Sequence, residues 1–169
     1  MTVIPEIILM TRWHAPSRCK ERLSRGIGTK NAAYIQHLLT KHAISVASSI
    51  KTKGLAEITL SISGLGPKAS HRWARKEGIH NFSIQRSGSL GLKMKREINK
   101  VQRRVHPLSR RSKGVILIGT DLPTLCQRDL IEALEIIKTD QIVLGPSKDG
   151  GYWLIGLGKK FVNPLIDWP

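Results

Sequence analysis

The sequence predicts an α/β fold, a three-layer sandwich with a mostly parallel sheet. Helix and strand patterns alternate along most of the chain, which is typical of a parallel sheet covered by helices. Two short, β-branched apolar runs, residues 4–10 and 115–118, predict buried strands. Since 169 residues with 40% hydrophobic content can bury one core, we expect a single domain over residues 1–169.

In the first half of the chain we expect a strand, a long helix and a second strand. The strand of residues 4–10 is followed by a polar, Arg-rich segment that extends to Gly28. Thr29 is placed to cap the helix and Gly54 to end it. Alternation over residues 58–62 predicts the next strand. Apolar residues recur in the helix at three- and four-residue steps: Ala32, Ile35, Leu39, Ala43, Val46 and Ile50.

Two further helices and a weak strand are expected before the second apolar run. A short helix covers residues 69–76, and the weak strand covers residues 79–85. A basic helix then begins near residue 90 and ends at Pro107. Its apolar residues share one face: Leu90, Met94, Ile98, Val101 and Val105.

After the run at residues 115–118 we expect a helix over residues 130–137. Two strands, residues 141–145 and 152–157, then lie on either side of a Gly-rich loop. In parallel sheets ligands bind outside the carboxyl ends of the strands. The segments to search are therefore those that follow Met10, Ile118 and Gly145.

The charge is strongly positive and unevenly distributed. Lys+Arg number 28 and Asp+Glu 12, which gives a net charge of +16. Residues 1–113 hold 23 basic and 5 acidic side chains, and residues 114–169 hold 5 and 7. Such a chain attracts anions, nucleic acid included. Single-strand binders add aromatic platforms, however, and this chain has few aromatic residues, so nucleic acid is not the favoured partner.

Several classes of protein are excluded by simple features. No apolar run reaches the roughly 18 residues of a membrane span, and the N-terminus lacks the pattern of a secretory signal. Cys19 and Cys126 form neither a disulfide framework nor a zinc motif, and Cys19 is expected to be a small buried side chain. We expect a cytoplasmic protein without a membrane span.

Asp121 leaves the end of a buried strand in the segment Gly119-Thr120-Asp121-Leu122-Pro123. Carboxylate oxygen is the ligand that Mg²⁺ and Mn²⁺ prefer, and these ions commonly bridge to phosphate oxygens. Asp121 is equally suited to starting a turn or capping a helix. Both interpretations stay open on this segment alone.

A second carboxylate, Asp149, stands before Gly150, Gly151 and Tyr152. The glycines allow close approach of the backbone to a ligand, although Asp-Gly is also a strong hairpin signal. Two carboxylates on neighbouring strand-end loops would hold one divalent ion beside a diphosphate. Gly88, ahead of the basic helix, is placed to present backbone amides to an anion.

Basic side chains follow the first strand at Arg12, Arg18, Lys20 and Arg22, close to Pro16. Arginine binds phosphate in a bidentate manner and lysine as a point charge, so this loop suits phosphate binding. A solvated basic loop is the alternative.

These segments, in this order, resemble the glycosyltransferase-like family once described as a domain of unknown function and often associated with arsenosugar biosynthesis. Residues 12–23 are similar to its Arg-x-Pro-x-x-Gly-x-x-Lys-Thr-Arg-Leu opening, although Ser17 stands in place of the glycine. Residues 85–94 resemble its Gln-x-x-Gly-Asp-Leu-Gly-Glu-Arg-Met segment. Residues 119–123 and 145–157 match its two most distinctive blocks.

The resemblance implies the nucleotide-diphospho-sugar transferase fold, which is GT-A-like and Rossmann-like. It implies that Asp121 and Asp149 are catalytic and hold Mg²⁺ or Mn²⁺. It places Gly150, Gly151 and Tyr152 on the acceptor side. The nucleotide-binding residues it implies are Arg12, Pro16, Lys20, Arg22, Gly88, Gly119 and Thr120.

The expected function is metal-dependent transfer from a nucleotide or nucleotide-sugar donor to an acceptor that the sequence does not name, with glycosyl transfer first. Nucleotidyl transfer of the guanylyltransferase type is the alternative, because the two chemistries share this fold. A basic nucleic-acid-binding protein or an inactive relative on the same scaffold is a further alternative. We also expect the domain to be short at its C-terminus relative to the family.

Overall fold

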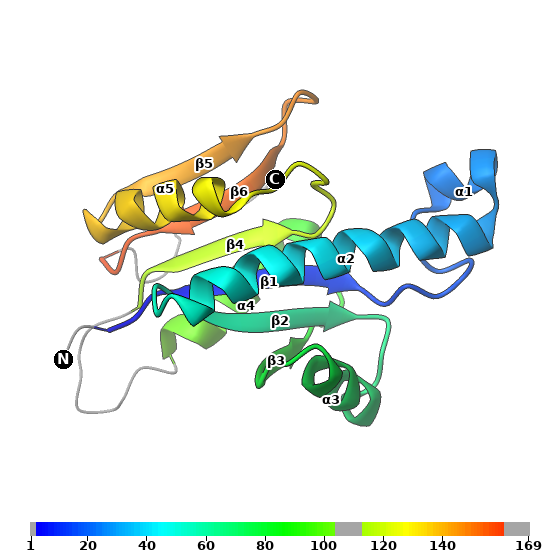
Figure 1. Cartoon of the computed structure of the whole chain (residues 1–169), viewed down its shortest axis with the longest axis horizontal. Helices are drawn as coiled ribbons and strands as arrows, with labels where there is room; N and C mark the ends of the chain where they lie inside the picture. The colour runs from blue at the N-terminus through cyan, green and yellow to red at the C-terminus, as the bar shows by residue number, and fades with distance from the viewer. Residues whose placement is uncertain (1–2, 104–112, 161–169) are drawn as a thin grey trace.

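The computed structural model describes residues 3–103 and 113–160 of the chain. Its centre is a six-stranded sheet in the order β3-β2-β1-β4-β6-β5, with helices packed against both faces (Figure 1). The expected three-layer α/β sandwich is therefore confirmed. Among residues 3–103 and 113–160, the helices include no candidate membrane span.

The sheet is mostly parallel. Strands β3, β2, β1 and β4 pair in parallel, whereas β6 runs antiparallel to both of its neighbours, β4 and β5. Each expected strand is present within about two residues of its predicted ends. The bounds are β1 Glu6–Arg12, β2 Glu57–Ser63, β3 Asn81–Ile84, β4 Val115–Gly119, β5 Ile142–Pro146 and β6 Tyr152–Leu157.

Two apolar clusters show how the helices cover the sheet. Alternate residues of β1 and β4 face opposite sides: Ile7 joins a cluster with α2, α3 and α5, and Ile8 joins a cluster with α4. Figure 1 accordingly shows α2 and α5 in front of the sheet and α4 behind it. The helices are α1 Glu21–Ile27, α2 Thr29–Thr52, α3 Pro67–Lys76, α4 Leu90–Arg103 and α5 Gln127–Lys138.

The long helix α2 differs from its expected pattern in two respects. Thr29 is its first residue and not its cap, and the chain enters the helix through Gly28 at a φ of 83°. Its buried stripe includes Gln36 and Thr40, whereas Ile35, Leu39 and Val46 are only partly buried. The stripe therefore lies slightly to one side of the most apolar residues.

Two other expectations were wrong. The Arg-rich segment after β1 was expected to be a loop, but it contains α1, a short helix with no buried residue. In α4 the residues Met94, Ile98 and Val101 are buried as expected, but Leu90 is 66% exposed because it lies in the first turn. Val105 and Pro107 lie outside the described residues.

Candidate functional site

The loops after β1, β4 and β5 lie at one edge of the sheet. Strands β1 and β4 pair in parallel, and β5 shares their direction because β6 is antiparallel to both β4 and β5. All three strands therefore end on the side toward which α1 projects (Figure 1). The three segments that the sequence singled out follow these strand ends, where ligands of open α/β sheets bind.

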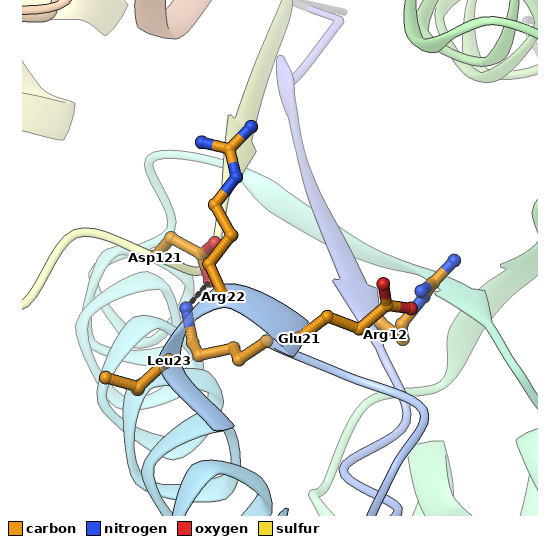
Figure 2. A pocket seen from close by; sticks show the side chains of 6 residues that line it. Arg12, Glu21, Arg22, Leu23 and Asp121 are labelled. Atoms are coloured by element: carbon orange, nitrogen blue, oxygen red, sulfur yellow. Dashed lines mark ion pairs between the residues drawn. The ribbon is translucent and has the colours of Figure 1, made fainter. Parts of the chain in front are cut away.

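A pocket of about 500 Å³ opens at this edge (Figure 2). It joins the end of β1 and the first turn of α1 to the segment after β4, so residues about a hundred positions apart share it. Four of the six lining residues were expected in the site, and Glu21 and Leu23 were not. The lining residues are Arg12, Lys20, Glu21, Arg22, Leu23 and Asp121.

The ammonium group of Lys20 lies 3.0 Å from a carboxylate oxygen of Asp121, an ion pair drawn as a dashed line in Figure 2. The Lys20 side chain is 16% exposed and that of Asp121 is 70% exposed. An ion pair this open to solvent contributes less than about 1 kcal/mol to folding. The pair therefore brings a cation and a carboxylate together in the pocket but contributes little to the stability of the fold.

The loop between β1 and α1 positions these cations through its own backbone. The guanidinium of Arg12 donates a hydrogen bond to the carbonyl of Arg18 at 3.1 Å. Lys20 has left-handed dihedrals, and its carbonyl accepts the first backbone hydrogen bond of α1, from Ser24. Ser17 also has a positive φ of 64°, which explains why a glycine suits this position in the family pattern.

Cys19 is buried in this loop and its thiol donates to the carbonyl of Ala15 at 3.4 Å. Burial raises the pKa of the Cys19 thiol, which keeps it protonated. The expectation of a small buried side chain is confirmed. Its sulfur is not among the groups that line the pocket.

Asp149 lies in the turn of a hairpin formed by β5 and β6. Its carboxylate accepts hydrogen bonds from the Ser147 hydroxyl and from the backbone N–H of Gly151, and the Ser147 bond is the main cause of its lowered pKa. The hairpin interpretation of Asp-Gly is confirmed. Asp149 does not line the pocket, and the cage of two carboxylates stays a prediction.

The other expected residues do not line the pocket. Gly119 is exposed at the end of β4, Thr120 is buried behind it, and Pro16 is exposed on the β1–α1 loop. Gly88, at a φ of 131°, precedes α4. The hydroxyl of Tyr152 lies 3.7 Å from the sulfur of Met94, and burial raises the pKa of this tyrosine.

The donor set suits a cation shared with a substrate. Within the described ranges there is no group of three or more His, Cys, Asp or Glu residues that could hold a metal alone. Mg²⁺ does not need such a group, because it is usually bound by one or two carboxylates together with waters and substrate phosphates. The Lys20 ammonium already lies beside the Asp121 carboxylate, so this carboxylate is in contact with a cation. These residues therefore fit a divalent ion that arrives with phosphate oxygens.

Comparison with solved structures defines the fold. A candidate nucleotide-diphospho-sugar transferase from Desulfovibrio desulfuricans G20 is 24% identical, with a TM-score of 0.75 over 97% of this chain and 69% of that one. The 4-diphosphocytidyl-2C-methyl-D-erythritol synthase of Anaerococcus prevotii DSM 20548 is 11% identical, with a TM-score of 0.51 and coverages of 94% and 72%. Rv0371c of Mycobacterium tuberculosis H37Rv, in complex with manganese, is 15% identical, with a TM-score of 0.50 and coverages of 99% and 77%. The chain has the fold of the nucleotide-diphospho-sugar transferases.

The particular family follows from the sequence. The profile of the family described as "Uncharacterized protein conserved in bacteria (DUF2064)" matches residues 46–167, and the chain belongs to this family. The resemblance expected from the motifs is confirmed. No curated protein matches the chain.

Next to the site, an aromatic cluster gives folding a predictable pH dependence. The ring of His14 lies 4.1 Å from that of Trp13 and 4.4 Å from that of His37. Burial lowers the pKa of His14 below 6.5, the positive charges of His37 and Lys76 lower it further, and Glu77 opposes them. Within the described part of the chain, nothing hydrogen-bonds to its Nδ1.

Because the unfolded chain binds the His14 proton more readily, stability is expected to fall as the pH drops through about 6.5. The unfolding temperature of the wild type should therefore fall between pH 7.5 and pH 5.5. His14→Phe keeps an aromatic ring and should make this loss smaller. Equal losses in the wild type and His14→Phe would contradict the assignment.

Proposed function

We propose that this chain is a metal-dependent transferase that uses a nucleotide-activated donor, with glycosyl transfer as its reaction. The observation that carries the proposal is the pocket at the carboxyl edge of the sheet, which Arg12, Lys20, Arg22 and Asp121 line together and in which Lys20 pairs with Asp121. A fold of this class supplies the scaffold, and the pocket supplies the chemistry. A cytoplasmic location is part of the same proposal.

The charges of the pocket suit a leaving diphosphate. In glycosyl transfer from a nucleotide sugar, the bond between the sugar and the diphosphate breaks and negative charge develops on the departing oxygen. Lys20 and Arg22 are placed to stabilise that charge, and Arg12 to bind a phosphate group. A divalent ion at Asp121, either Mg²⁺ or Mn²⁺, would neutralise the diphosphate when bound.

The remaining expected residues have supporting roles in the proposal. Pro16, Gly88, Gly119 and Thr120 shape the nucleotide side. Asp149 is the second carboxylate, and its hairpin loop provides the acceptor side. The acceptor-side residues are Gly150, Gly151 and Tyr152.

Nucleotidyl transfer is the second candidate, supported by the fold shared with the 4-diphosphocytidyl-2C-methyl-D-erythritol synthase. The two reactions differ in what leaves. Glycosyl transfer releases a nucleoside diphosphate from a nucleotide sugar, whereas nucleotidyl transfer releases pyrophosphate from a nucleoside triphosphate. Product analysis with each donor class therefore separates them.

A screen of nucleoside diphosphates and nucleotide sugars by thermal unfolding tests the proposal. A ligand that binds only the native state raises its stability, by about 2.7 kcal/mol at a hundred times its dissociation constant. We expect stabilisation by at least one of these ligands with Mn²⁺, and less with EDTA. No stabilisation by any of them at millimolar concentration would overturn the proposal.

Two arginines of α1 provide a matched pair for that screen. Arg22 lines the pocket and Arg25 does not, although both are on the same short helix. Arg22→Gln should reduce the stabilisation by ligand and Arg25→Gln should not. If a polynucleotide binds instead, with an affinity that falls steeply between low and moderate salt and equal losses in both variants, the basic nucleic-acid-binding alternative is favoured.

A further inference from the structure

Four polar side chains are buried together, and two of them directly precede pocket-lining residues in the sequence. Thr11 comes from β1, Gln36 and Thr40 from α2, and Thr120 from the residue after β4. Their exposed fractions are 4%, 4%, 1% and 3%. Polar groups this deeply buried are costly unless their hydrogen bonds are made.

The hydrogen bonds of this cluster close on themselves. The hydroxyl oxygens of Thr11 and Thr40 are 3.0 Å apart, Thr40 donates to Thr120 at 3.4 Å, and Thr120 donates to Thr11 at 3.2 Å. When Thr11 donates to Thr40 and not to the carbonyl of Arg12, which lies 3.5 Å away, each of the three hydroxyls donates once and accepts once within the ring. The Gln36 amide also donates to Thr40 at 3.2 Å and to Thr120 at 3.4 Å. Such closed networks hold their members in one arrangement.

The cluster lies where the backbone pairing of β1 with β4 stops. The paired register ends at Met10 with Gly119, so Thr11 and Thr120 are the next residues on each side. Beyond that point the hydrogen bond between the Thr11 and Thr120 side chains connects the two segments, where backbone pairing has ended. The next residues again are Arg12, the last residue of β1, and Asp121, in the segment after β4, and both line the pocket.

Helix α2 ties the same cluster to the third part of the pocket. Gln36 and Thr40 are on α2, and α1, whose first turn contains Arg22, precedes α2 with only Gly28 between the two helices. A shift of α2 relative to the strand ends would therefore move the α1 residues relative to Arg12 and Asp121. The cluster connects all three elements that line the pocket.

We propose that Thr11, Gln36, Thr40 and Thr120 are positioning residues that fix the spacing between the phosphate-binding side chains and Asp121. The inference rests on the proposed function. Apolar side chains of similar volume would fill this space without the cost of burying polar groups, so stability alone does not account for the cluster. Preorganised spacing does account for it, because a phosphate ligand is bound best by charges already in place.

Thr40→Val tests the inference, with Thr59→Val as its matched control. Thr59 is 1% exposed on β2, and its hydroxyl bonds to Glu6, away from the pocket. We expect Thr40→Val to weaken binding of the nucleoside diphosphate found in the screen, with Mn²⁺ present, by about tenfold, comparable with one lost hydrogen bond. Thr59→Val should change it less than about twofold despite a similar loss of unfolding temperature, and Thr40→Ser should restore it.

Gln36→Met provides a second variant of similar volume should Thr40→Val not fold, and it too should weaken binding. Wild-type affinity in Thr40→Val or Gln36→Met, or equal weakening by Thr59→Val, would overturn the inference.

Hydrogen exchange separates this inference from the proposed function. Without ligand, Thr40→Val should speed exchange in residues 12–23 and 119–123 together, whereas Thr59→Val should not. If the wild type binds no nucleotide, the proposed function fails, and the exchange result still decides whether the cluster positions the pocket. Unchanged exchange in Thr40→Val would overturn the positioning role.

Discussion

Asp121→Asn is expected to abolish the metal-dependent part of nucleotide binding while the protein stays folded. An amide is a weaker ligand than a carboxylate for a hard cation, and it carries no charge to balance one. The loss should exceed the 10- to 100-fold that removal of an outer partner of a metal ligand typically causes. The unfolding temperature should change little, because the Asp121 side chain is 70% exposed and pairs with Lys20 at the surface.

The measurement is calorimetric titration of a nucleoside diphosphate, once with Mn²⁺ and once with EDTA. The wild type should bind more tightly with Mn²⁺, and Asp121→Asn should give the same weak binding in both buffers. Glu135→Gln, a loss of one charge at an exposed position of α5, is the control and should behave as the wild type. A variant at Asp121 that keeps its dependence on Mn²⁺ would refute the metal assignment.

Asp149→Asn extends the same titration to the predicted second ligand. If one ion is held by both carboxylates, this variant should lose the Mn²⁺ dependence as Asp121→Asn does. If Asp149 only shapes its hairpin through Ser147 and Gly151, the affinity should stay near that of the wild type.

Gly158→Ala is expected to cause the largest loss of stability, about 3 kcal/mol, the upper part of the usual range for overpacking. A Cβ at this position would lie 2.5 Å from the Cα of Asp140 and 3.0 Å from the carbonyl oxygen of Ile137. These are backbone atoms, which cannot turn aside as a flexible side chain can. For a domain of this size the unfolding temperature should fall by roughly 6–12 °C.

Gly26→Ala is the control for that substitution. Nothing lies within 4 Å of a Cβ at Gly26, which is in α1, and alanine favours a helix over glycine. Calorimetric unfolding of the two variants should therefore show a large loss for Gly158→Ala and none for Gly26→Ala. Equal stability of Gly158→Ala and the wild type would show that Gly158, which follows β6, packs less tightly against the turn between α5 and β5 than the structure indicates.

Most of the fold could be predicted because its apolar patterns are strong. The β-branched runs of β1 and β4 have few polar interruptions, and Gly54 and Gly78 stop the helices that precede them. The edge of the sheet that carries the pocket followed from this alternation, since the ends of parallel strands meet there. The positions of Arg12, Lys20, Arg22 and Asp121 within one pocket are consistent with that reasoning.

The rest depended on tertiary contacts that local patterns do not record. Helix α1 buries no side chain, so its sequence has no apolar stripe from which the helix could be predicted. Gln36 and Thr40 are polar, and a search for apolar periodicity passes over them. The sequence signal for their burial was their spacing, because Ala32, Gln36, Thr40 and Ile44 follow one another at steps of four residues along α2. The pairing of Lys20 with Asp121 joins residues about a hundred positions apart, and no sequence motif predicts the left-handed conformation of Lys20.

The short helix α1 has a consequence for the affinity of any ligand. It has seven residues and no core of its own, so its local opening costs little free energy compared with unfolding of the sheet. The free energy of ordering this helix then offsets part of the attraction between a phosphate group and Arg22. A ligand will bind more weakly than its contacts suggest, and it will leave correspondingly faster.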